Sequence, residues 1–310
     1  MAYKYHPYSR LSIIKGNLGN AKRFFFNRWK LNSILSCKPF FIVGAGRSGN
    51  TLLRAILCGH KDIGIPPESY IIGPAIIEWL KNNYLRWENL VSLILGQIAT
   101  HEEFDTWEID LNKIAGELRK LPDNRKSFAA IIDKLYCVYN AKYFPGAKRW
   151  GDKTPLNTFY LEWIERAFPD AQFIIMIRDG RDSASSYYKT GLVKDIEDGC
   201  RIWNDAMACV ERLDPKKSIR IKYERLVNNT EFEIRKVCSF LKIEFQSEML
   251  DHTKRFYDLG DVPKRKHHKN LLLPITNKNI GKWKKDLTEK EKKVIDILLS
   301  ETLTKHGYKK

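Results

Sequence analysis

The sequence has no long apolar run and no internal repeat. No uninterrupted apolar stretch in its 310 residues approaches the ~20 residues that a membrane-spanning helix needs. The start lacks the apolar run and small-residue cleavage site of a secretory signal. Linkers and low-complexity tracts are also missing, while 43% of the residues are apolar, enough for a large core. We therefore expect a soluble, cytoplasmic protein, and we exclude the disordered and fibrous classes.

Cysteine occurs in no metal-binding or redox pattern. The chain has no Cys-x-x-Cys pair, and no cysteine has a metal-ligand spacing to a histidine. The thiols are expected to be reduced and mostly buried, and the sequence predicts no metal site. The six cysteines are Cys37, Cys58, Cys137, Cys200, Cys209 and Cys238.

Acidic residues are absent from the start of the chain. Residues 1–61 contain 11 Lys or Arg and no Asp or Glu, within a formal net charge of +17 for the whole chain. Residues 263–310 carry a net charge of +9, so the centre of the chain carries −3. Basic ends around a nearly neutral centre favour an anionic ligand held between the two ends. Nucleic acid or an anionic membrane surface would also suit this pattern.

Residues 1–37 form a basic, aromatic leader, and residues 38–310 are expected to form one domain. The leader either lies on a membrane surface or acidic partner as a helix, or packs against the domain. Its basic and aromatic residues include Lys22, Arg23, Phe24, Phe25, Phe26, Arg28 and Trp29.

The domain alternates apolar strand patterns with helical patterns. Strands are predicted at 39–43, 171–178 and 218–222, and helices at 51–57, from about 181, at 231–241 and at 289–306. This alternation predicts an α/β, P-loop-like domain of three layers, with a central parallel sheet flanked by helices. Residues from about 69 to 145 are helical in pattern and are expected to form a cap on this domain.

A glycine-rich turn, Gly44-Ala45-Gly46-Arg47-Ser48-Gly49-Asn50-Thr51, joins the first predicted strand to a helix. Glycines let successive backbone N–H groups face one anion, and the helix N-terminus adds partial positive charge at the same point. This pattern predicts a phosphate-binding loop. Asn50 stands where a nucleotide-triphosphatase loop requires its lysine, which argues against ATP or GTP. The alternative is a turn that merely joins strand to helix.

Four further segments follow the loop in order. They are Ile65-Pro66-Pro67-Glu68-Ser69, then Gly151-Asp152-Lys153-Thr154-Pro155, then Arg178-Asp179-Gly180-Arg181 with Ser186, and finally Tyr223 with Gly281-Lys282-Trp283-Lys284. Together these segments resemble the sulfotransferases that use 3′-phosphoadenosine-5′-phosphosulfate (PAPS). The resemblance is to the branch that includes tyrosylprotein and bacterial carbohydrate or small-molecule enzymes.

The resemblance implies a role for each segment. Arg47, Ser48, Gly49, Asn50 and Thr51 would hold the 5′ side of PAPS, and Arg178 with Ser186 would hold its 3′-phosphate. Tyr223, Lys282 and Trp283 would also contact the donor. Glu68 would act as the base, and Lys153 with Arg47 would stabilise charge on the leaving oxygen.

Simpler interpretations stand beside these roles. Glu68 could be a solvated loop carboxylate, and Lys153 a surface ammonium at a strand end. His60 and His101 are alternative bases, and Asp179 could bind magnesium in an NTPase.

The closing loop departs from the family pattern. Gly281 stands where the tyrosylprotein branch has an assisting serine, so a backbone N–H or Lys282 would substitute. The usual Arg-Lys-Gly triplet is Thr276-Asn277-Lys278 here. The basic run Lys264–Lys269 is typical of a solvated loop, with recruitment of an anionic acceptor as an alternative.

The sequence thus predicts an enzyme that transfers a sulfuryl group from PAPS, without a metal, to an acceptor hydroxyl. A sugar or small molecule, which could be anionic, is the expected acceptor, and no nucleic-acid partner is expected. The competing hypotheses are a P-loop kinase or NTPase and a non-catalytic module that binds polyanions.

Overall fold

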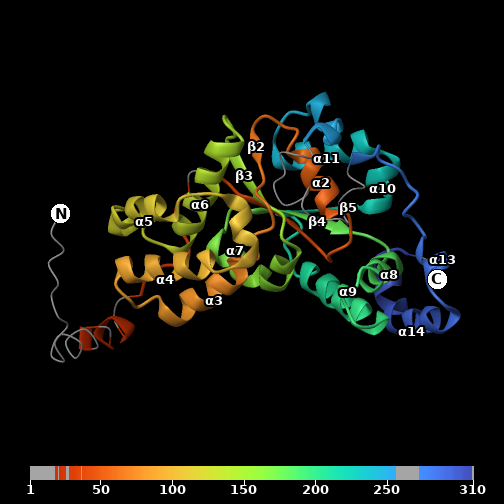
Figure 1. The fold of residues 1–310 in the computed structure, drawn as a ribbon, viewed down its shortest axis with the longest axis horizontal. Helices are drawn as coiled ribbons and strands as arrows, with labels where there is room; N and C mark the ends of the chain where they lie inside the picture. Colours follow the sequence, from red (N-terminus) through yellow and green to blue (C-terminus); the bar gives the residue numbers. More distant parts are fainter. Residues whose placement is uncertain (1–17, 20, 26–27, 36, 256–271, 309–310) are drawn as a thin grey trace.

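The computed structural model describes residues 18–19, 21–25, 28–35, 37–255 and 272–308 (Figure 1). Five parallel strands form one sheet in the order β2-β3-β1-β4-β5. The strands are β1 (Phe40–Val43), β2 (Ile63–Gly64), β3 (Arg149–Asp152), β4 (Gln172–Ile177) and β5 (Ser218–Lys222). The parallel sheet confirms the predicted α/β class.

The two central strands, β1 and β4, are almost wholly apolar. All four residues of β1 are buried, and Ile42 is aligned with Ile174 of β4. Such continuous apolar runs are typical of parallel strands covered on both faces. Because all five strands point the same way, the residues that follow them meet at one edge of the sheet.

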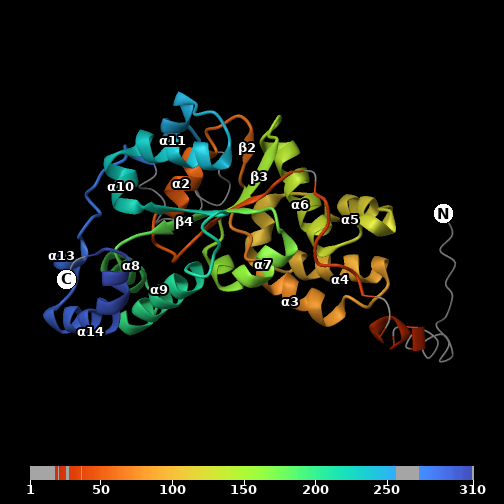
Figure 2. The same ribbon diagram turned by 180° about the vertical axis from the view of Figure 1, so that it is seen from behind.

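Helices cover both faces of the sheet. In Figure 1, α2 (Asn50–Leu57), α10 (Tyr223–Asn228) and α11 (Thr230–Leu241) lie above the central strands. Below them lie α8 (Gly180–Lys189), α9 (Ile196–Val210) and α14 (Glu289–Lys305), and Figure 2 shows the same arrangement from behind. The short helices α7 (Leu161–Ala167) and α13 (Trp283–Asp286) complete the domain.

Residues 69–145, which follow β2 and precede β3 in the sequence, are mainly helical. Their helices are α3 (Ile72–Asn82), α4 (Trp87–Ala99), α5 (Leu111–Arg119) and α6 (Phe128–Tyr143), with the 3-10 helices η1 (Glu102–Trp107) and η2 (Asp123–Arg125). They form the lobe at the left of Figure 1. Trp79, Trp87, Trp107 and Tyr136 are fully buried in it, so this insert has an aromatic core of its own.

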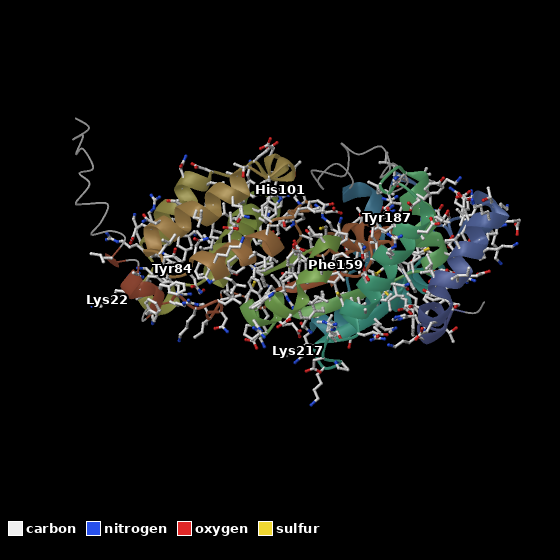
Figure 3. All side chains as sticks on the ribbon, turned by 90° about the horizontal axis from the view of Figure 1, so that it is seen from below. Lys22, Tyr84, His101, Phe159, Tyr187 and Lys217 are labelled. Carbon is white, nitrogen blue, oxygen red and sulfur yellow. The ribbon has the colours of Figure 1, made fainter. Side chains whose placement is uncertain are left out.

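The described part of the leader packs against this insert. The Trp29 indole donates to the Leu85 carbonyl oxygen at 2.8 Å, and its ring meets the Trp87 ring edge to face. Arg23 Nε donates to the Tyr84 carbonyl oxygen at 2.9 Å. Figure 3 shows Lys22 and Tyr84 together at the far end of the insert. These contacts favour the hypothesis that the leader packs against the domain, although Phe26 and residues 1–17 lie outside the described residues.

Two other expectations concern the whole chain. Of the six cysteines, Cys58, Cys200 and Cys238 are buried and the other three are half-buried. Within the described ranges, no helix is both long enough and apolar enough to cross a bilayer.

Candidate active site

The glycine-rich turn forms a tight loop between β1 and α2. Gly44 and Gly49 have φ angles of 125° and 91°, which L side chains rarely adopt. A Cβ on Gly49 would also lie 2.5 Å from a carbon of the Tyr223 ring. Gly49 caps α2 without a side-chain hydrogen bond, so the helix begins with backbone N–H groups that suit an anion.

Asn50 takes a structural role in place of a phosphate-reaching lysine. Its Nδ2 donates to the Ala45 carbonyl oxygen at 2.9 Å, which closes the loop from within. Ser48 Oγ lies 3.4 Å from Ser183 Oγ on α8, so the loop is also fixed to the neighbouring helix.

Glu68 and Lys153 form a buried ion pair at the carboxyl edge of the sheet. Lys153 Nζ donates to Glu68 Oε1 and also lies 3.2 Å from Thr51 Oγ1. The side chains of Lys153 and Glu68 are 0% and 8% exposed. The solvated-loop interpretation of Glu68 and the surface interpretation of Lys153 are therefore both wrong. The pair lies beside the first turn of α2, next to the phosphate-binding loop.

Tyr70 is a third member of this cluster that sequence analysis missed. Its hydroxyl donates to Glu68 Oε2, and its ring stacks on His101 with the planes 5° apart. Tyr70 has a φ of 51°, which is unusual for a bulky residue and turns its side chain back toward Glu68. Of the two alternative bases, His101 contacts the ring of Tyr70. His60 instead bonds the Glu244 carbonyl oxygen at 2.9 Å.

Asp152, the residue before Lys153, anchors this part of the site. Its carboxylate accepts hydrogen bonds from the Tyr136 hydroxyl at 2.6 Å and from Asn157 Nδ2 at 2.7 Å. Burial raises the pKa of Asp152, while these hydrogen bonds oppose the rise. The insert, β3 and the segment after β3 are thus joined directly behind Lys153.

Arg47, Ser186 and Arg178 lie on the other side of the loop. Arg47 Nε donates to Ser186 Oγ at 3.1 Å, and Arg178 Nη1 donates to the Arg47 carbonyl oxygen at 3.0 Å. The Arg178 guanidinium lies 4.7 Å from the centroid of the Tyr223 ring. Burial lowers the pKa of Arg47, with the nearby charge of Arg178 acting in the same direction. Four residues predicted to hold one nucleotide are therefore linked by successive contacts, from Ser186 through Arg47 and Arg178 to Tyr223.

The closing loop is fastened to α8 by Asp182. Its carboxylate accepts from the backbone N–H of Gly281 at 2.8 Å and of Trp283 at 3.0 Å. The Gly281 N–H is therefore engaged by Asp182, so this backbone group does not substitute for the family's serine, whereas another backbone N–H or Lys282 stays a prediction. Lys282 Nζ lies 3.7 Å from an Asp286 oxygen, and the Trp283 ring faces the Arg181 guanidinium.

A cavity of about 980 Å³ opens at this edge of the sheet. Arg47, Glu68, Arg178 and Tyr223 line it, together with Gly49, Asn50 and Thr51 of the loop. Lys153 contacts Glu68 and Thr51, and Ser186 contacts Arg47, whereas Ser48 contacts Ser183 and does not line the cavity. Lys282 and Trp283 do not line the cavity, so their contact with the donor stays a prediction, and the basic run Lys264–Lys269 lies outside the described residues.

Tyr187 covers the loop from α8. A Cβ on Gly46 would lie 2.1 Å from the Tyr187 hydroxyl, so only glycine permits this approach. Burial raises the pKa of Tyr187 to about 12, although Arg47 opposes the rise. The hydroxyl therefore stays protonated near neutral pH.

The carboxylate of Asp179, the candidate magnesium ligand, makes its hydrogen bonds within the first turn of α8. The Asp179 carboxylate caps α8 through the Arg181 N–H and pairs with the Arg181 guanidinium. Within the described ranges, no three His, Cys, Asp or Glu side chains gather into a group that could hold a metal ion.

The chain is similar in sequence to known proteins. The model of the sulfotransferase family matches residues 39–247. A putative protein-tyrosine sulfotransferase of Caenorhabditis briggsae is 27% identical over 221 residues, covering 68% of each chain. The protein-tyrosine sulfotransferase of Drosophila melanogaster is 26% identical over 257 residues, which cover 78% of this chain but only 46% of that protein. The nodulation protein NoeE of Sinorhizobium fredii is 24% identical over 303 residues, or 86% of this chain and 65% of that one.

Solved structures share the fold. The sulfotransferase domain of the Synechococcus PCC 7002 olefin synthase has a TM-score of 0.60 at 21% identity, covering 89% of this chain and 98% of that domain. The sulfotransferase domain of the curacin biosynthetic pathway has a TM-score of 0.54 at 18% identity, covering 90% and 99%. Since the family model matches more than half of the residues, the chain belongs to the sulfotransferase family.

Proposed function

We propose that the protein transfers a sulfuryl group from PAPS to the hydroxyl of a carbohydrate or small-molecule acceptor. One observation carries this proposal. A buried carboxylate–ammonium pair, Glu68 and Lys153, lies beside the same glycine-rich loop that Arg47 and Arg178 flank from the other side. This arrangement supports the proposal, because the candidate base and the glycine-rich loop line one cavity while the fully buried Lys153 contacts both.

The residues around the loop fit the two phosphate-bearing ends of such a donor. Arg178 Nε is buried and has no hydrogen-bond partner among the described residues, so it is available to an anionic oxygen. The backbone N–H groups at the start of α2 have no side-chain cap, so they can donate to an anion held at the loop. Ser186, which accepts a hydrogen bond from Arg47, adds a hydroxyl beside Arg178 for the predicted 3′-phosphate, while Arg47 itself belongs to the predicted 5′ side.

The chemistry follows from these groups. PAPS supplies an activated sulfuryl group with adenosine 3′,5′-bisphosphate as the leaving group. Glu68 takes the proton of the acceptor hydroxyl as the new O–S bond forms, and Lys153 donates to the oxygen that gains charge as the old S–O bond breaks. Arg47 shares this role from the loop. Sulfuryl transfer thus resembles phosphoryl transfer, because it depends on positioning and on charge stabilisation.

The test separates donor binding from turnover. We expect Glu68→Gln to bind adenosine 3′,5′-bisphosphate as the wild type does and to lose transfer of labelled sulfate by about 10²-fold or more. Arg178→Ala should instead weaken bisphosphate binding by at least about tenfold. Glu162→Gln and Arg201→Ala, which change exposed ion pairs, are the matched controls. Full turnover by Glu68→Gln, or an unchanged dissociation constant for Arg178→Ala, would reject these assignments.

The competing hypotheses make different predictions in the same assays. A kinase or NTPase would consume ATP with magnesium, whereas the proposed reaction proceeds in EDTA. A polyanion-binding module would show steeply salt-dependent binding without preference for the bisphosphate.

A further inference from the structure

The order of the strands divides the cavity into two ends. Strands β3 and β5 lie on opposite sides of the β1–β4 pair. Residues that follow β3 therefore lie at the end of the cavity with Lys153 and Glu68. Residues that follow β5, such as Tyr223 and Val227, lie at the opposite end.

Five apolar side chains line the end next to Glu68, and we call them the acceptor wall. Pro155, Leu156 and Phe159 come from the 3-10 helix η3 (Pro155–Tyr160) directly after Lys153. Ile202 comes from α9, which packs against η3, and Leu192 follows α8 and bonds back to Tyr187. Figure 3 shows Phe159 and Tyr187 together near the middle of the molecule.

Two members of this wall are exposed although they line a cavity. Phe159 is 42% exposed and Leu192 is 55% exposed. Apolar surface of this kind, continuous with a functional cavity, is typical of a ligand-binding surface. By contrast, among the described residues of the insert only Tyr70 lines the cavity. The acceptor wall, and not the body of the insert, is therefore the surface that an acceptor would contact.

We propose, on the basis of the proposed sulfotransferase function, that the acceptor is an uncharged phenol or alcohol whose hydroxyl is carried by an apolar body. The apolar body would lie against the acceptor wall and cover Phe159 and Leu192. The hydroxyl would reach Glu68, beside the ring of Tyr70.

The charges at this end favour an uncharged acceptor. Glu68 and Lys153 neutralise one another, and Arg178 lies beyond the loop at the donor side. Between residues 155 and 202, the side chains that line the cavity are the acceptor wall, Arg178 and Tyr187, and Tyr70 lines it beside Glu68. The hydroxyls of a sugar facing this wall would lose water without gaining hydrogen bonds, which is unfavourable. An acidic peptide would find no opposite charge on the acceptor wall.

The reaction balances without a further reagent. The acceptor oxygen forms a bond to sulfur while its proton moves to Glu68. The bond between sulfur and the bridging oxygen breaks, and the electron pair leaves with adenosine 3′,5′-bisphosphate. The product is a sulfate ester of the apolar acceptor.

The test uses 4-alkylphenols from 4-methylphenol to 4-butylphenol as acceptors of the full-length chain. We expect kcat/KM to rise by about fourfold for each added methylene group, the increment for burying one methylene. Phe159→Ser and Leu192→Ser should each raise KM for 4-butylphenol by at least about tenfold and flatten this rise. Both variants should bind adenosine 3′,5′-bisphosphate as the wild type does. Ile297→Ser, at a 78% exposed position on α14, is the matched control and should change nothing.

Three results would overturn the inference. They are a kcat/KM that does not depend on chain length, wall variants with unchanged KM, and a higher kcat/KM for an acidic tyrosine peptide or a monosaccharide. In each of these cases bisphosphate binding persists, so the proposed function stands. If the chain neither binds the bisphosphate nor sulfates any acceptor, the proposed function fails together with the inference.

Discussion

Lys153 and Glu68 make an ion pair that water barely reaches, so removing one charge leaves the other buried alone. In Lys153→Met, the Glu68 carboxylate keeps the Tyr70 hydrogen bond but loses its countercharge. Breaking a buried pair in this way costs about 3–5 kcal/mol of unfolding free energy. At about 2 °C per kcal/mol for a chain of this size, Tm should fall by roughly 6–10 °C.

The double variant Lys153→Met/Glu68→Gln removes both charges and should recover much of this loss. Replacing a buried pair with neutral groups is often nearly neutral for stability. We expect a coupling energy of about 0.5–3 kcal/mol between the two positions. Transfer activity should remain lost in both single variants and in the double variant, because the chemistry needs the base and the ammonium together. Stability and activity are thereby separated.

Thermal unfolding followed by circular dichroism measures the stability, and transfer of labelled sulfate measures the activity. Lys148→Met is the matched control, since Lys148 is 75% exposed and pairs with Asp62 at the surface. Such a pair contributes only about 0–1 kcal/mol. A double variant that melts no higher than Lys153→Met, or a Lys153→Met variant as stable as the wild type, would refute the reasoning.

Three further predictions concern the loop, the cavity rim and the base. Gly49→Ala should lower the free energy of unfolding by more than ~1 kcal/mol in urea titrations, since Gly49 has positive φ and no space for a Cβ. Gly96→Ala on α4, with open space around it, should instead raise it by about 0.5–1 kcal/mol. Burial lowers the pKa of His252 from its ordinary value, so the unfolded chain binds the proton first as the pH falls. Tm should therefore drop as the pH falls below about 6.5, and His252→Gln should flatten this drop; parallel curves would contradict it. Tyr70→Phe, which keeps the ring but removes the donor to Glu68, should lower kcat by about tenfold at unchanged donor KM, and an unchanged kcat would exclude a positioning role.

Strong apolar patterns made the central strands and most helices predictable. The segment 218–222 is β5 itself, and 171–178 contains β4. Strand β3 was missed because its four residues, Arg-Trp-Gly-Asp, carry two charges and have no apolar alternation. It is a strand because it pairs with β1 and β2, and pairing between distant segments leaves no local signal.

The parts of the candidate site that lie in short local motifs could be predicted from the sequence. The loop after β1 and the arginine after β4 follow from the strand–turn–helix pattern. The contact between Glu68 and Lys153 spans 85 positions, so the sequence placed both residues by resemblance but not beside each other. The contact of Tyr70 with Glu68 could not be predicted from the sequence. Tyr70 adopts a backbone φ of 51°, and no sequence pattern predicts this value for a tyrosine.

Asp182 shows how the fold links the donor loop to the closing loop. Asp179, the acid that the motif singled out, serves the N-terminus of α8, whereas Asp182 one turn later holds the N–H groups of Gly281 and Trp283. Arg178, at the end of β4, donates to the carbonyl oxygens of both Arg47 and Asn279. A single strand–helix junction therefore sets the positions of two loops that are more than 200 residues apart in the sequence.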